Sequence, residues 1–148
     1  MQQIKILSKK EIKNIKKKLN EQWGFTNDLN FTFLISSKGR INIVNKEVFD
    51  IDDTKLRIDS LGLYFATLIH NELRLSIEGS HIVGPFATKN IFELDEDQIK
   101  DWIKGNDIKT EHPDTGFQVV KNNVDFFGCG RIKNNNLLNY FPKSRRIG

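Results

Sequence analysis

The C-terminal end of the chain holds the residues whose types and spacing most favour a particular chemistry. Lys143, Arg145 and Arg146 place three cations within four residues, directly after the aromatic residues Tyr140 and Phe141. Guanidinium groups suit phosphate oxygens, and aromatic rings beside cations commonly stack on unpaired bases. The combination indicates contact with single-stranded nucleic acid. A frayed, solvated basic terminus is the alternative.

Further cations occur upstream of this segment. They are Lys121, Arg131 and Lys133, so that residues 118–148 hold six cations in all against the single acid Asp125. If residues 141–147 form a final strand, Lys143 and Arg145 project to one face and Arg146 to the other. A hairpin could then bring Arg131 and Lys133 alongside this final strand.

The net charge of +4 on 148 residues, with a pI near 9.2, conceals an uneven distribution. Residues 1–20 carry seven lysines against Glu11, whereas residues 90–111 are predominantly acidic. Two basic poles therefore flank an acidic middle, which suggests a polyanionic partner. We interpret the N-terminal lysines as the solvated face of a helix and assign the function to the C-terminal pole.

Catalytic and metal-binding chemistry finds little support in the sequence. The spacings of His70, His81 and His112 match no metal-ligand pair, and Cys129 is the only cysteine. Cys129 stands between two glycines, where a bulge or a close backbone approach explains the pattern better than a nucleotide-binding loop. We therefore expect no enzyme, no cofactor and no metal.

Composition limits the class of protein. Hydrophobic residues make up 38% of the chain, and eleven phenylalanines can fill a core. A single cysteine excludes a disulfide framework and indicates a reducing compartment. The longest apolar run, residues 61–69, is too short to span a bilayer. We expect a cytoplasmic protein without a membrane partner.

The first half reads as a helix followed by strands. Ser8 and Glu11 form a capping-box pattern, and Ile12, Ile15 and Leu19 recur at helical spacing after it. Alternation over residues 31–44 predicts a hairpin, residues 46–51 a short helix, and residues 61–69 a buried strand. A further strand is expected over residues 73–77. The segment 79–89, with Gly84 and Pro85, is the expected seam between two small domains.

The second half reads as compact and mostly β. We expect a strand over residues 91–94 and a helix over residues 95–104 that stops at Gly105. Two strands over residues 116–120 and 124–132 are expected next, then a polar loop at residues 134–136 and a final strand over residues 141–147. The predicted fold class is α+β, with domains spanning residues 1–86 and 87–148.

Three stretches together resemble a known family, the small ribosome-biogenesis factors called Nip-seven, of the archaeal type. The first is the hairpin at residues 31–44. The second runs from residues 61–65 through 73–75 and 83–87 into 91–94, and the third is residues 98–109 with its Gly105-Asn106 end. Residues 128–130 resemble the Gly-x-Gly of a later strand. The resemblance implies a small pre-PUA α/β domain with an antiparallel sheet, followed by a PUA-type β pseudo-barrel that binds RNA.

The resemblance also implies a function. It is that of a non-catalytic factor in ribosomal RNA processing and large ribosomal subunit biogenesis, with other assembly factors or the exosome as protein partners. RNA would lie across the first helix of the PUA domain, the next strand and the last strand. The basic ending, residues 142–146, separately resembles PUA-like tails of Sun-family RNA cytosine-5 methyltransferases, which we read as RNA contact alone. The candidate RNA-binding residues are Gly105, Lys109, Lys121, Arg131, Lys133, Lys143, Arg145 and Arg146.

A protein-interaction adaptor with little RNA affinity of its own is the competing hypothesis. It rests on the nearly continuous apolar strand at residues 61–69 and on the lysine-faced helix at residues 9–22.

Overall fold

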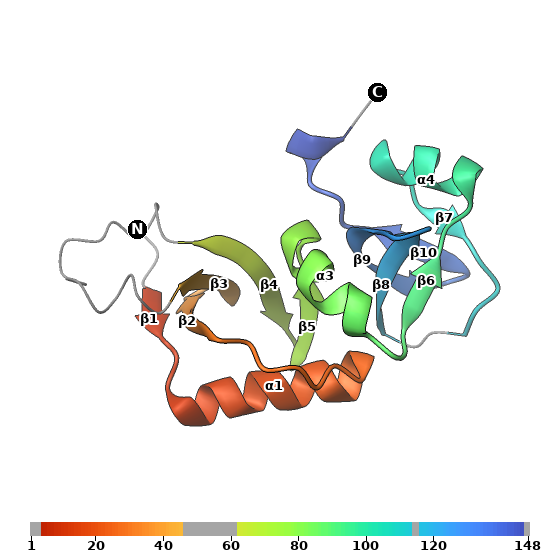
Figure 1. Ribbon diagram of the computed structural model, residues 1–148. Coiled ribbons are helices and arrows are strands. Elements are labelled where there is room, and N and C mark those ends of the chain that lie inside the picture. The colour runs from red at the N-terminus through yellow and green to blue at the C-terminus, as the bar shows by residue number, and fades with distance from the viewer. Residues whose placement is uncertain (1–3, 46–61, 114–115, 147–148) are drawn as a thin grey trace.

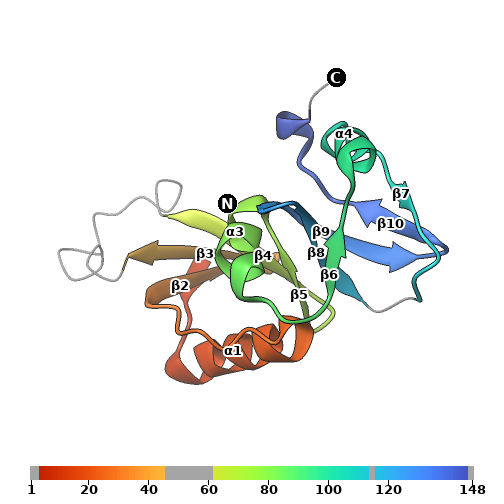
Figure 2. The same cartoon turned by 45° about the vertical axis from the view of Figure 1, so that its right-hand side comes forward.

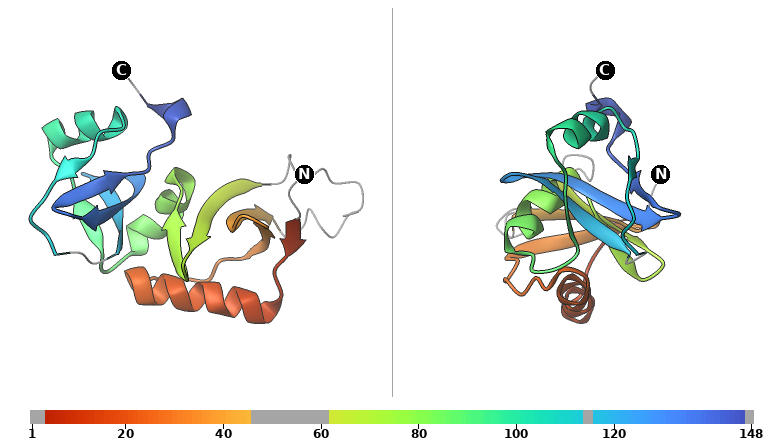
Figure 3. Two further views of the ribbon diagram at one scale, coloured as in Figure 1. Left: turned by 180° about the vertical axis from the view of Figure 1, so that it is seen from behind. Right: turned by 90° about the vertical axis from the view of Figure 1, so that its right-hand side faces the viewer.

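Two five-stranded sheets and the helices packed on them make up the computed structural model, which describes residues 4–45, 62–113 and 116–146. The sheets lie next to each other, with helix α1 against the first and helix α4 against the second (Figure 1). The same arrangement is visible after a turn of 45° (Figure 2) and from behind (Figure 3). The predicted α+β class is confirmed. None of the helices within the described residues is long and apolar enough to cross a membrane.

The first sheet is antiparallel throughout and follows the order of the chain, β1-β2-β3-β4-β5. Its strands are β1 (Ile4–Ile6), β2 (Phe31–Ser36), β3 (Arg40–Asn45), β4 (Leu63–Ile69) and β5 (Glu72–Leu75). The predicted hairpin over residues 31–44 is therefore confirmed. The strand predicted over residues 61–69 is only partly buried, since Leu63 is 52% exposed. The predicted helix over residues 46–51 lies outside the described residues.

Helix α1 (Lys9–Trp23) packs its apolar side on the first sheet and buries Ile15, Leu19 and Trp23. The predicted capping box is present. The Glu11 amide donates to the Ser8 hydroxyl over 3.2 Å, and the Ser8 amide donates to the Glu11 carboxylate over 3.1 Å. The two bonds satisfy donors that the first helical turn would otherwise leave free.

The segment between the sheets is helical, contrary to the prediction of a strand up to residue 77 and a loop-like seam after it. Strand β5 ends at Leu75 and the Ser76 side chain caps α3 (Ile77–Val83), which leads into η3 (Gly84–Phe86). A side chain at Gly79 would collide with the Phe65 carbonyl oxygen. This glycine therefore allows α3 to pack closely on β4, and a close approach between distant residues is not visible in local sequence patterns.

The second sheet has the order β6-β8-β9-β10-β7, with β6 parallel to β8 and the other pairs antiparallel. Its strands are β6 (Ile91–Glu93), β7 (Ile108–Lys109), β8 (Phe117–Asn122), β9 (Asp125–Lys133) and β10 (Asn136–Asn139). Asp95 and Gln98 form a second capping box at the start of α4 (Glu96–Ile103), close to the predicted boundaries. The register between β8 and β9 shifts near Cys129, and Gly128 has a φ of 83°. The bulge predicted at the two glycines is thus confirmed.

The end of the chain differs from the prediction. Residues 136–139 form β10, which the sequence pattern did not indicate, and residues 143–145 form the short helix η4 (Lys143–Arg145) in place of a final strand. The Asn139 side chain donates to the carbonyls of Trp102 and Asn106 and accepts from the Phe141 amide. These bonds draw the backbone away from the sheet, and Pro142 then offers no N–H for a ladder.

The hydrophobic core crosses from one sheet to the other. Its larger cluster combines side chains of α1 and the first sheet with Phe117, Val119, Phe126 and Cys129 of the second sheet. A smaller cluster surrounds Trp102 beneath α4. The predicted division between residues 86 and 87 coincides with the end of η3, and it remains a prediction that the two halves are separate domains.

Candidate nucleic-acid interface

Two of the predicted cations flank one strand on an exposed face of the second sheet. Lys109 of β7 and Lys133 of β9 are both paired with Asn136 of β10. Paired residues share a face of a sheet, and strands lie about 4.8 Å apart. The backbones of the two exposed lysines are therefore about 10 Å apart. This spacing lets both ammonium groups contact one polyanionic strand.

Arg131 extends the same face, because it lies two residues before Lys133 on β9. Its guanidinium lies 5.4 Å from the centre of the Phe117 ring and 4.0 Å from the Glu72 carboxylate. Both partners of this ion pair are about 40% exposed, so the pair is weak and leaves the arginine available for other anions. We refer to Lys109, Arg131 and Lys133 as the sheet-face cluster.

Three other predicted cations form a second group at η4. Lys143, Arg145 and Arg146 are all exposed, and Arg145 makes a 2.5 Å ion pair with Glu78 of α3. The Arg146 Nε donates to the Phe141 carbonyl over 3.0 Å, and its side chain lies over Gly105. The structure thus brings Gly105 and Arg146 into contact at the end of α4. We refer to Lys143, Arg145 and Arg146 as the tail cluster.

Lys121 lies apart from both clusters. Its ammonium nitrogen lies 5.8 Å from the centre of the Phe126 ring, and its backbone lies opposite that of Glu93 in the β6–β8 ladder. Four residues of β8 separate it from Phe117, the ring that Arg131 contacts, which corresponds to about 13 Å of strand. The predicted hairpin between residues 131–133 and the C-terminal segment is wrong, because β9 pairs with β10 instead.

The two aromatic residues before the tail cluster have different surroundings. Tyr140 is 37% exposed, whereas Phe141 is only 8% exposed and belongs to the core under α4. Tyr140 is therefore the ring that can receive a base. Arg74 of β5 lies 4.6 Å from the centre of the Tyr140 ring. No local sequence pattern connects Arg74 with Tyr140, because the two residues are 66 positions apart in the chain.

The single cysteine of the chain, Cys129 of β9, is an unreactive thiol. Burial raises the pKa of the Cys129 thiol to about 12, and its sulfur accepts a hydrogen bond from the Leu75 amide over 3.3 Å. A thiol with so high a pKa is protonated at neutral pH and is a poor nucleophile. Within residues 4–45, 62–113 and 116–146, no three histidine, cysteine or acidic side chains gather as a metal site would require.

The second sheet and α4 have counterparts among known proteins. Residues 89–147 match the family described as the methyltransferase RsmF PUA domain. A stretch of 90 residues, 60% of the chain, is 28% identical to ribosomal RNA small subunit methyltransferase F of Aeromonas salmonicida. The aligned part spans 19% of the length of that relative.

These similarities confirm the PUA-type fold predicted for the second half. They support a PUA-type RNA-binding module in general and do not single out the Nip-seven family.

Proposed function

We propose that the protein is a non-catalytic RNA-binding factor that holds RNA on its PUA-type half. The observation that carries the proposal is the sheet-face cluster, where Lys109 and Lys133 flank β10 on one exposed face. Cations at this spacing suit the repeating phosphates of a nucleic-acid backbone. The tail cluster supplies additional positive charge at the end of α4. The match to a PUA domain supports RNA as the polyanion.

Ribosomal or pre-ribosomal RNA is the substrate class we propose. The support is the name of the similar protein, a ribosomal RNA methyltransferase of the small subunit, together with the resemblance to Nip-seven. That resemblance adds a role in large-subunit biogenesis, in the cytoplasm, with assembly factors or the exosome as partners. Cross-linking RNA to the protein in cells and sequencing the fragments would determine which subunit the RNA comes from.

A charge-reversal variant tests the proposal. The double variant Lys109→Glu/Lys133→Glu should bind single-stranded RNA at least about tenfold more weakly, because two phosphate contacts become repulsive. The matched control is Lys10→Glu/Lys13→Glu, which reverses two exposed lysines of α1. Fluorescence anisotropy with labelled RNA measures both. A folded sheet-face variant that binds as tightly as the wild type would contradict the proposal.

Salt dependence gives a second measure of the same interface. If four cations of the two clusters contact phosphates of a single strand, log affinity should fall with log salt at a slope of about −3. The sheet-face variant should show a shallower slope, and the α1 control should not.

An independent experiment distinguishes the adaptor function from the RNA-binding function. The exposed hydrophobic residues Ile6 and Leu63 of the first sheet, each at least 50% exposed, could contact another protein. Affinity capture from cell extract is performed with and without nuclease. Protein partners that persist without RNA would favour the adaptor, whereas partners lost with the RNA favour the RNA-binding factor.

A further inference from the structure

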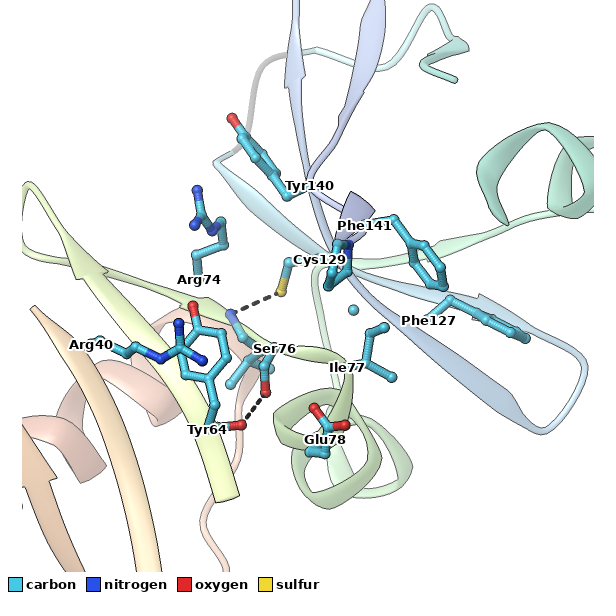
Figure 4. Close-up of a pocket in the computed structure, with 13 residues that line it drawn as sticks. Arg40, Tyr64, Arg74, Ser76, Ile77, Glu78, Phe127, Cys129, Tyr140 and Phe141 are labelled. Atoms are coloured by element: carbon cyan, nitrogen blue, oxygen red, sulfur yellow. Dashed lines mark hydrogen bonds between the residues drawn. The ribbon is translucent and has the colours of Figure 1, made fainter. Parts of the chain in front are cut away.

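A groove with a volume of about 230 Å³ opens where the two sheets meet (Figure 4). One side comes from β3, β4, β5 and the start of α3, and the other comes from the bulge of β9 and residues 140–142. The side chains that give it chemical character are Arg40, Tyr64, Arg74, Glu78, Phe127 and Tyr140.

Two arginine–tyrosine pairs dominate the walls. The Arg40 guanidinium lies 3.9 Å above the centre of the Tyr64 ring, and Arg74 extends toward Tyr140 (Figure 4). The chain has two tyrosines in all, and both line this groove. Planar guanidinium and phenol groups are the surfaces on which unstacked bases are received in single-stranded RNA sites.

The charges of the groove are arranged to attract an anion. Neither Arg40 nor Arg74 makes an ion pair with any residue that the structure describes. Among the described residues of the lining, the one carboxylate is that of Glu78, and it makes a 2.5 Å ion pair with Arg145. Two guanidinium groups are therefore left to bind phosphate oxygens.

Hydrogen bonds hold the walls of the groove in place, one between its two sides and one within the first side. The Leu75 amide donates to the Cys129 sulfur over 3.3 Å, which connects β5 to the bulge of β9. The Ser76 hydroxyl donates to the Tyr64 carbonyl over 2.5 Å and holds the start of α3 against β4. A preorganised groove of this kind loses little entropy when a ligand enters.

The groove also continues into the sheet-face cluster. Arg74 contacts Tyr140, the Tyr140 ring lies 6.1 Å from that of Phe117, and Arg131 lies over Phe117. An RNA strand on the sheet face could thus extend one nucleotide into the groove without leaving the protein surface.

We propose that the groove binds a single unpaired nucleotide of the RNA that the sheet-face cluster holds. Its base stacks beside Tyr140 and the Arg74 plane, and its phosphate lies between Arg74 and Arg40. The volume of about 230 Å³ is below the roughly 300–1,000 Å³ of pockets that enclose drug-sized ligands, so the groove would hold one base and leave the rest of the strand outside. This inference rests on the proposed function, and it adds a preference for unpaired over fully base-paired RNA.

The two tyrosines provide the test. Protein labelled with fluorotyrosine gives two fluorine NMR signals, which Tyr64→Phe and Tyr140→Phe variants assign. A short single-stranded RNA of mixed sequence should shift both signals. An abasic strand of equal length, with the phosphates but no bases, should leave the Tyr140 signal in place, and so should a phosphotyrosine peptide.

Binding measurements on variants provide a second readout. Arg40→Gln should weaken binding of single-stranded RNA by at least about tenfold, the lower limit for loss of a hydrogen bond to a charged group. Lys38→Gln, an exposed cation on the same hairpin outside the groove, should change it little. Tyr140→Leu should weaken the binding of single-stranded RNA at least about fivefold. Phe86→Leu, which alters an exposed aromatic residue outside the groove, should leave the affinity unchanged.

The outcomes separate this inference from the proposed function. One outcome would be that single-stranded RNA binds to the protein, that the sheet-face variant binds it more weakly, and that neither tyrosine signal shifts. This outcome would overturn the groove proposal and leave the RNA-binding function standing. A shift caused equally by the abasic strand or by the phosphopeptide also overturns it. If wild-type protein binds no RNA at all, both proposals fail.

Discussion

Gly105 and Arg146 contact each other because glycine leaves room at the end of α4. Gly105 has a φ of 96°, which suits glycine best, and a Cβ there would collide with the Arg146 side chain. The same glycine therefore ends the helix and provides the surface on which Arg146 lies. If this position matters for RNA binding, it acts by placing the arginine.

The ionisation of Glu11 is coupled to the contacts that its carboxylate makes at the start of α1. Its carboxylate accepts a 2.8 Å bond from Lys5 and a 3.1 Å bond from the Ser8 amide. The Lys5 bond, followed by the Ser8 backbone bond, lowers the pKa of Glu11 from 4.5 to about 2. A carboxyl group whose pKa is lower in the folded state stabilises the fold above its unfolded pKa, and this stabilisation is lost as the pH falls.

We therefore expect Glu11→Gln to be less stable than the wild type near neutral pH. The difference should shrink as the pH falls from about 4.5 to about 2. Glutamine keeps the capping-box hydrogen bond, so the variant isolates the charge. Urea unfolding at a series of pH values measures the difference in the free energy of unfolding. A difference that stays constant over this range would show that the charge has no role.

At the scale of elements, α1, the hairpin of β2 and β3, and α4 could be predicted because their signals are local. Ser8 and Asp95 mark helix starts within a few residues, and alternation over residues 31–44 indicates strands regardless of their surroundings. The bulge of β9 next to Cys129 is also predictable, since a glycine stands on each side of this residue in the sequence.

The elements that the sequence did not indicate depend on contacts between distant residues. Helix α3 fits because Gly79 tolerates the Phe65 carbonyl, and β10 is terminated by bonds from Asn139 to the end of α4. The C-terminal cations could be identified by type, but their separation into a sheet-face and a tail cluster follows from the pairing of β9 with β10. No neighbouring residue in the sequence indicates that Arg40 and Arg74 line a groove.

Helix α4 offers a prediction at this scale because the acids Asp95, at the N-cap, and Asp97, in the first turn, have different roles. Asp95 accepts from the amides of Asp97 and Gln98 at 3.0 and 2.8 Å, and Gln98 completes the capping box. Asp95→Ala should lower the free energy of unfolding by about 1 kcal/mol.

The matched control is Asp97→Ala, which removes the same charge from the same turn and keeps the cap. It should cost less than Asp95→Ala, about 0.3 kcal/mol, because an exposed side chain in the first turn loses only its interaction with the helix dipole. Urea unfolding compares the two variants. Equal losses would assign the effect to charge and not to the capping hydrogen bonds.

At the scale of the whole molecule, the groove exists because the two sheets pack against each other. Its walls come from residues as far apart in sequence as Arg40 and Tyr140. The packing that positions them is the shared core, in which Phe126 lies against Gly84 so closely that a side chain there would collide with the ring. A binding site between the sheets therefore requires that they stay together in solution.

The shared core predicts cooperative unfolding, and the two tryptophans allow the prediction to be tested. Trp23 lies in the core of the first sheet and Trp102 beneath α4 in the second, both fully buried. Protein labelled with fluorotryptophan reports each half separately by fluorine NMR, with Trp→Phe variants used only for assignment. Both native signals should disappear with the same urea midpoint, because losing either half exposes Phe117, Val119 and Phe126 to water. Two separate midpoints would instead show that residues 1–86 and 87–148 unfold as independent domains, and the groove would then be a contact between parts that can separate.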